Sequence, residues 1–268
     1  MEEKVDSLDY LLVPAGLLVL GIYHVWLFIT VLRNPIRTVI GLNAHTRQQW
    51  VFSMMTEPLK NGVLIIQTLR NNIMASTLLA TTAITLCSVI SVLVSSQSIS
   101  DRSRTVSVHL FYANYTPPLS SIKYLCILLC FLVAFLCNVQ STRYYAHVSF
   151  LGTVPTWKDK TGFIEYVAAT LNRGSYFWSL GLRAFYLSIP LFLWIFGPIP
   201  MFISCCVMSV VLYFLDTTSS FAQIIHIQLF KEEARTNDVE SIAQSSNNSG
   251  GENFFHLRDP LVTGSGWL

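Results

Sequence analysis

The sequence predicts an all-α integral membrane protein, a helical bundle with about five transmembrane helices plus amphipathic helices on the inner membrane surface. Of its 268 residues, 52% are hydrophobic and only 12% are charged. A soluble domain averages roughly 25% charged residues. The apolar residues also cluster into long runs, and a helix needs about 20 such residues to cross a bilayer. Composition and run length together therefore place the chain in the membrane class.

Five segments are long and apolar enough, or nearly so, to cross a bilayer. They are residues 10–32, 73–95, 123–142, 175–196 and 200–216. The fourth contains Arg183 and Pro190, and the GPIP sequence at 197–200 predicts a tight turn into the fifth. A four-span alternative stays open, in which residues 175–189 lie along the membrane interface and residues 190–215 cross once.

The distribution of lysine and arginine predicts the orientation. With five spans, the basic residues gather on one side if the N-terminus is outside or lumenal and the C-terminus is cytoplasmic. The inner segments then hold Arg33, Arg37, Arg47, Lys60, Arg70, Arg143, Lys158, Lys160 and Arg173, and the outer side holds Lys4, Arg102, Arg104 and Lys123. Asn114 opens the sequon NYT in a loop predicted to face outward, so it is a candidate glycosylation site. The expected location is the plasma membrane or an endomembrane.

Amphipathic helices are predicted between the spans on the inner side. Residues 44–70 are expected to form two short helices that meet at Pro58, and residues 158–172 a further one. These helices either pack under the bundle, which requires no function, or lie on the lipid surface. The transmembrane domain is expected over residues 1–230. The tail at 231–268, rich in Ser, Asn and Gly, is expected to be disordered and cytoplasmic, and it could contact protein partners.

Several functional classes are excluded by composition and motifs. The net charge of +2 is too small to indicate nucleic-acid binding. All six cysteines lie inside apolar runs, which argues against disulfides, and no other Cys or His near Cys126 and Cys130 could complete a metal site. His24 and His147 differ too much in depth to bind a haem together, so no metal or cofactor is expected. There is no Walker loop, HExxH or GxSxG, and we do not expect an enzyme.

The polar residues within the spans are the candidate functional site. Counted at about 1.5 Å per residue from the inner interface, His24, Thr81, Thr82 and Arg183 all lie roughly 15 Å deep, with Asn138 slightly lower. A charge near the bilayer centre is costly and usually marks a site or a path. A guanidinium with five donors suits a small anion. The candidate solute-binding or pore-lining residues are Arg183, His24, Thr81, Thr82, Asn138 and Tyr186.

Other interpretations of the same residues stay open. Asp216 is the one acid assigned to the membrane, so Arg183 and Asp216 are a candidate ion pair. The depth estimate, however, places Asp216 roughly 15 Å lower, which requires a long reach or a shifted register. Arg183 could instead bond the carbonyls freed by Pro190. The hydroxyls of the second span could bond back to their own helix.

Several motifs together resemble a known family. They are YHVWL at 23–27, GLNAHTRQQWV at 41–51, QTLRNNIMASTLLATTAITLCS at 67–88, RGSYFWSLGLRAFYLSIPLFLWIFGPIP at 173–200 and LDTT at 215–218. This resembles the plant and bacterial membrane family catalogued as domain of unknown function 599, over roughly residues 8–230. The resemblance implies a multi-pass membrane protein and carries no activity, so it transfers no functional residues.

Two functional hypotheses follow. The first is a channel or carrier for a small anionic solute, centred on Arg183. The second is a non-transporting membrane adaptor or regulator that uses its basic inner loops and flexible tail. The environment of Arg183 distinguishes them, because a wet polar cavity favours transport and a dry bundle with Arg183 bonded to Asp216 or to carbonyls favours the adaptor.

Overall fold

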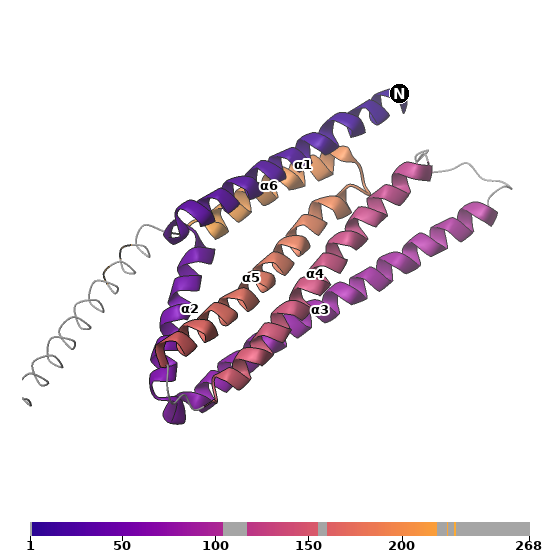
Figure 1. Cartoon of the computed structure of the whole chain (residues 1–268). Coiled ribbons are helices and arrows are strands. Elements are labelled where there is room, and N and C mark those ends of the chain that lie inside the picture. Colours follow the sequence, from indigo (N-terminus) through magenta and orange to yellow (C-terminus); the bar gives the residue numbers. More distant parts are fainter. Residues whose placement is uncertain (1, 104–116, 155–159, 219–223, 225–227, 229–268) are drawn as a thin grey trace, which may run out of the picture. The chain divides into compact units, whose positions relative to one another are not determined.

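The computed structural model describes residues 2–103, 117–154 and 160–218, together with residues 224 and 228 (Figure 1). The chain divides into two compact units, residues 1–218 and 219–268, and the account below concerns the first. Asn114 and the tail at 231–268 lie outside the described residues, so their predicted roles stay predictions.

The described chain is helical, which confirms the predicted fold class. Its elements are α1 (Glu2–Arg33), the short 3-10 helix η1 (Pro35–Arg37), α2 (Val39–Thr56), α3 (Pro58–Ser103), α4 (Pro117–Leu151), α5 (Lys160–Leu193) and α6 (Pro198–Asp216). Five stretches in the described residues are long and apolar enough to cross a membrane: Asp9–Arg33, Lys60–Ser96, Ile122–Leu151, Thr161–Leu193 and Pro198–Asp216.

The turn between α5 and α6 divides the segment that the four-span alternative takes as a single crossing. Residues 194–197 leave the helix, and Gly197 has a φ of +142°, a conformation that favours glycine. The Gly197 amide donates to the Trp194 carbonyl at 3.2 Å, which closes the turn. Residues 190–215 therefore do not form one continuous crossing helix.

The helices pack as two groups joined by α2. In one group α4 lies between α3 and α5, and in the other α1 lies alongside α6 (Figure 1). α6 also contacts α5, and α2 runs from the end of α1 to the start of α3 while packing against α5.

The amphipathic helices were expected to be separate from the spans, and this expectation is wrong for two of them. The segment after Pro58 is the first part of α3, which continues for 46 residues, and residues 160–172 are the first part of α5. Pro58 occupies the first turn of α3, where a missing N–H costs nothing, and no further proline follows until residue 117. A helix of 46 residues is about 69 Å long. It greatly exceeds a hydrocarbon core of about 30 Å.

A small apolar cluster of Ala83, Ala134 and Ala184 joins α3, α4 and α5, and two larger apolar cores hold the bundle together. One contains residues of α1, α3, α4, α5 and α6, with Met201 and Cys205 fully buried beside Ile127. The other joins α2 to the first part of α3, the last part of α4 and the first part of α5. Its buried members are Val51, Met55, Ile65, Leu69, Tyr145, Val148, Ile164, Val167, Ala168 and Leu171.

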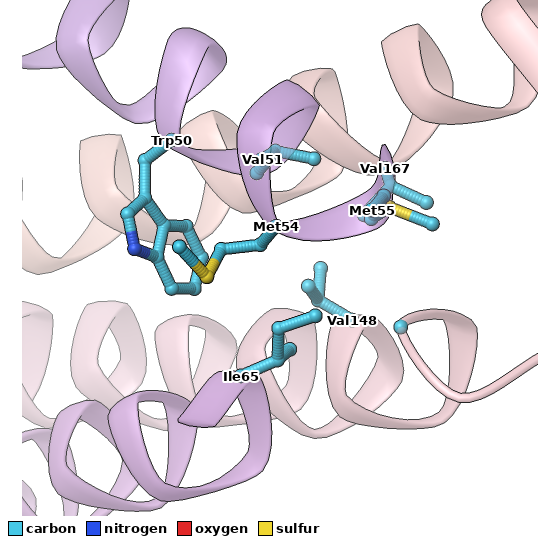
Figure 2. A pocket seen from close by; sticks show the side chains of 8 residues that line it. Trp50, Val51, Met54, Met55, Ile65, Val148 and Val167 are labelled. Atoms are coloured by element: carbon cyan, nitrogen blue, oxygen red, sulfur yellow. The ribbon is translucent and has the colours of Figure 1, made fainter. Parts of the chain in front are cut away.

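We call the region around this second core the α2 cap, comprising residues 39–69, 145–151 and 160–171. Figure 2 shows Trp50 and Met54 of α2 on one side of a small space and Ile65 of α3 on the other. The space among these side chains is an apolar cavity of about 10 Å³, room for about one water molecule. The cap is thus packed by its own side chains.

Candidate functional site

Three side chains from three helices meet in a buried polar cluster. Arg183 of α5 donates from Nη2 to both carboxylate oxygens of Asp216, at 2.8 Å each, and the Tyr23 hydroxyl of α1 donates to Oδ2 of the same carboxylate. The side chains of Arg183 and Asp216 are 15% and 12% exposed. We call these three residues the Tyr23–Arg183–Asp216 triad.

The estimate that set Asp216 about 15 Å below Arg183 is wrong, and the turn at Gly197 gives the reason. Arg183 lies 14 residues before Gly197 and Asp216 lies 19 residues after it. The offset along two antiparallel helices is therefore five residues, or about 7.5 Å. A long arginine side chain spans that offset. The depth estimate was wrong because it counted Arg183 and Asp216 from two separately assigned membrane interfaces, and the errors of the two assignments added.

Aromatic neighbours position the Tyr23 ring. His24 packs edge-on against it at 5.2 Å between ring centroids, and Trp26 lies at 6.2 Å and itself contacts Tyr213 of α6 at 5.3 Å. The half-buried His24 donates from Nδ1 to the Leu20 carbonyl of its own helix at 2.8 Å. Of the predicted site residues, His24 therefore lies beside the triad and makes its hydrogen bond within α1.

Asn138 is fully buried at the contact between α4 and α5. Its Nδ2 donates to the Ala134 carbonyl at 2.8 Å, and its Oδ1 is buried without a hydrogen-bond partner. A Cβ at Gly181 would lie 2.6 Å from Nδ2, so the absence of a side chain there makes room for the amide. Nearby on α4, Ser141 shares a hydrogen bond of 3.3 Å with Ser76 of α3. Of these polar groups, the two serines join α3 to α4, whereas the Asn138 amide bonds within α4 and packs against Gly181 of α5.

Thr81 and Thr82 do not face the triad. Both lie on the exposed side of α3 and donate to the Leu78 carbonyl, at 2.9 and 2.8 Å. α3 packs mainly against α4, and its buried side carries Ala83, which shares a cluster with Ala134 of α4 and Ala184 of α5. These hydroxyls follow the pattern of bonds within their own helix. Tyr186 is half-buried one turn beyond Arg183 on α5.

A second buried ion pair lies near the opposite ends of these helices, and the sequence analysis missed it. Lys123 of α4 is 2% exposed, and its Nζ lies 3.7 Å from Asp9 Oδ2 of α1. The same Nζ donates to the Trp194 carbonyl at 3.3 Å and lies 5.2 Å from the Trp194 ring centroid. The view that Asp216 is the one membrane acid is therefore wrong.

The sequence carried a signal for each missed residue. Asp9 and Lys123 both stand at the first residues of predicted spans that begin on the same side of the membrane. Tyr23 lies ten residues before Arg33, well inside its span, whereas membrane tyrosines usually gather at the interface. None of these positions can be paired without knowing which helix faces which.

A third polar contact attaches α2 to α5. Arg47 donates from Nε to Asn172 Oδ1 at 2.9 Å, and Asn172 donates from Nδ2 to the Ala44 carbonyl at 3.1 Å. Burial lowers the pKa of the Arg47 guanidinium, and the neighbouring Tyr145 and Tyr176 oppose that shift. An arginine nevertheless stays protonated in proteins, so this contact is a charge-assisted bond at any physiological pH.

In the triad, the positive charge of Arg183 is neutralised by the Asp216 carboxylate. Arg183 and Asp216 compensate one another and Tyr23 satisfies the carboxylate further, while Arg183 Nη1 is buried without a hydrogen-bond partner. Within the described part of the chain, no three His, Cys, Asp or Glu side chains gather as metal ligands would. The arrangement therefore joins α1, α5 and α6 through one buried charge pair.

Long apolar helices whose charges are paired inside the bundle define the class of protein, an integral membrane helical bundle. Residues 11–221 match the family described as "Protein of unknown function, DUF599", so the chain belongs to that family and the resemblance seen in its motifs is confirmed. Comparison with curated proteins and with solved structures gave no match.

Proposed function

We propose that the protein is a non-transporting membrane adaptor or regulator, oriented with its N-terminus outside and with the α2 cap and C-terminal segment in the cytoplasm. The observation that carries the proposal is the pairing of Arg183 with both oxygens of Asp216. The hypothesis of an anion site required the charge of this arginine to be available.

The paired state disfavours an anionic solute for electrostatic reasons. An anion that approached Arg183 would also approach the Asp216 carboxylate, and the two charges together offer it little net attraction. To use Arg183 alone, the solute would first have to break a largely buried pair, and leaving one such charge unpaired costs about 3–5 kcal/mol.

The positions of the other candidate residues support the same proposal. Thr81 and Thr82 face away from the bundle, and Asn138 and His24 donate to carbonyls of their own helices. A polar path would require these groups to line one space with Arg183. Instead, the hydrogen bond of each of these groups is made to a carbonyl of its own helix.

With Arg183 paired, the features that could serve a function are the surfaces of the protein that partners can bind. The α2 cap has an internal apolar core and charged side chains outside it, which suits a platform for lipid or protein partners. No catalytic constellation is part of the proposal. The competing hypothesis, a carrier for a small anion, relies on Arg183 Nη1, which remains a spare donor.

Ion flux tests the proposal against that competitor. The purified full-length protein is reconstituted in liposomes loaded with chloride, nitrate or small organic acids, and efflux is measured for wild type and Arg183→Ala. We expect both to match protein-free vesicles. Lys60→Ala, which removes an exposed cation, controls for a nonspecific loss of charge. Wild-type efflux that Arg183→Ala abolishes and Lys60→Ala preserves would overturn the adaptor proposal.

A further inference from the structure

Five exposed arginines come from five different elements. Arg33 ends α1, Arg37 lies in η1, and Arg70, Arg143 and Arg173 lie within α3, α4 and α5. We call these five residues the arginine belt. They are distinct from Arg47 and Arg183, which are turned into the protein.

Packing contacts place three members of the belt at one level along the bundle. Gly174 packs so closely against α4 that a Cβ there would lie 3.0 Å from Tyr144 and Tyr145, which brings Arg173 level with Arg143. Leu69, next to Arg70, is buried in the same core as Tyr145 and Leu171. Arg70 therefore lies within about one helical turn of the other two.

The corner between α1 and α2 brings Arg33 and Arg37 near the same level. Asn172, the neighbour of Arg173, bonds the Ala44 carbonyl in the second turn of α2. η1 directly precedes that helix, and the Thr218 amide donates to the Arg37 carbonyl at 3.2 Å, which fixes the corner against the end of α6. The belt thus encircles the bundle where the α2 cap begins.

Exposed apolar side chains lie beside this belt, on the side away from the cap. About two turns along their helices from Arg70, Arg143 and Arg173, away from the cap, stand the exposed leucines Leu78, Leu136 and Leu180. Exposed leucines on three helices suit the hydrocarbon of a bilayer. The belt then falls at the level of the lipid headgroups, with the cap beyond it.

Acidic side chains do not balance the belt. In the stretches whose side chains are described, residues 9–57, 60–96, 122–154 and 161–218, the acids are Asp9, Glu57, Glu165 and Asp216. Asp9 and Asp216 belong to the buried pairs, and Glu57 pairs with Lys60 at 3.3 Å. Among the described residues, the five arginines of the belt therefore face one exposed acid outside these pairs, Glu165.

We propose that the arginine belt binds the phosphate groups of anionic lipids in the leaflet that faces the α2 cap. This deepens the proposed function, on whose orientation it rests, by naming the partner of the basic surface. A guanidinium fork matches a phosphate in geometry and charge, and it remains charged at every physiological pH. A basic residue at an anionic leaflet contributes about 1 kcal/mol, which corresponds to about fivefold in affinity.

Lipid retention in detergent tests the inference directly. The full-length protein, in a neutral detergent, is incubated with an equimolar mixture of phosphatidylglycerol and phosphatidylcholine, and the lipids retained after gel filtration are counted by native mass spectrometry. We expect wild type to retain phosphatidylglycerol selectively. Each of Arg70→Gln, Arg143→Gln and Arg173→Gln should lower that affinity about fivefold.

Matched variants separate phosphate recognition from general charge. Lys60→Gln removes an exposed cation that already pairs with Glu57, and it should leave lipid retention unchanged. Arg173→Lys keeps the charge without the fork and should recover part of the loss. Circular dichroism should show that these exposed variants remain folded.

Equal retention of both lipids by wild type would overturn the inference, and so would unchanged retention of phosphatidylglycerol in the variant that combines Arg70→Gln, Arg143→Gln and Arg173→Gln. Complete displacement of phosphatidylglycerol by inorganic phosphate would also overturn it, because it would indicate a site for free anions. Silent vesicles together with unselective lipid retention would overturn this inference alone. Flux that depends on Arg183, with selective retention intact, would overturn the proposed function alone.

Discussion

At the scale of single residues, the bundle satisfies its buried charges in pairs. Asp216 accepts hydrogen bonds from both Arg183 and Tyr23. Lys123 forms an ion pair with Asp9, donates to the Trp194 carbonyl and lies over the Trp194 ring. Removing one member of such a pair leaves its partner in an apolar surrounding with no compensating charge. The stability of the fold is therefore most sensitive to one-sided changes at these positions.

Asp216→Asn should destabilise the protein by about 3 kcal/mol, because it keeps the shape of the side chain and leaves the Arg183 charge unpaired. Thermal unfolding in detergent measures this as a lower melting temperature. The double variant Arg183→Met with Asp216→Leu removes both charges and should recover most of the loss. An unchanged melting temperature for Asp216→Asn would show that the pair contributes nothing to stability.

Gly181→Ala should destabilise by about 1–3 kcal/mol, because its Cβ would lie 2.6 Å from Asn138 Nδ2 in a closely packed contact. Gly21→Ala is the matched control, since no atom lies within 4 Å of the Cβ it would add and alanine favours a helix. The melting temperatures of the two variants should move in opposite directions. If both melting temperatures rise, the contact between Gly181 and Asn138 has room for a methyl group.

At the scale of elements, α2 is held by an apolar face and by one polar contact. Val51 and Met55 bury themselves among α3, α4 and α5, while Asn172 accepts from Arg47 and donates to the Ala44 carbonyl. The polar contact lies in the first half of α2 and the apolar face in its second half. The two halves should therefore respond differently to loss of the amide.

Asn172→Ala should increase amide hydrogen exchange in the first half of α2 about thirtyfold. It removes two hydrogen bonds, one of them to a charged group, for a loss of about 2 kcal/mol. Exchange mass spectrometry resolved along α2 measures the effect. Glu165→Ala, an exposed change on the same helix, should leave exchange unaltered. Equal acceleration along all of α2 would contradict the separate roles of its two halves.

At the scale of the whole molecule, orientation determines which surface meets which compartment. The lysine and arginine distribution predicts that the loop containing Asn114 faces outward and that the arginine belt faces the cytoplasm. Both the proposed function and the lipid inference depend on this orientation.

Asn114 should therefore be glycosylated when the protein is made in eukaryotic cells. An endoglycosidase-sensitive shift on a gel should disappear in Asn114→Gln. It should persist in Asn247→Gln, which removes the sequon NNS at 247–249 in the tail predicted to be cytoplasmic. A shift that only Asn247→Gln abolishes would reverse the orientation.

The sequence by itself determined the helical membrane class, the positions of the long apolar runs and the turn at Gly197, because length, apolar runs and glycine or proline chemistry are local properties. It also singled out Arg183, because a charge inside an apolar run is visible without a fold. Only the tertiary structure decided that Tyr23 and Asp216 complete its surroundings, that Lys123 meets Asp9, and that Thr81 and Thr82 face away from them. These outcomes depend on the rotation, tilt and neighbours of each helix, which are set by packing between segments far apart in the chain.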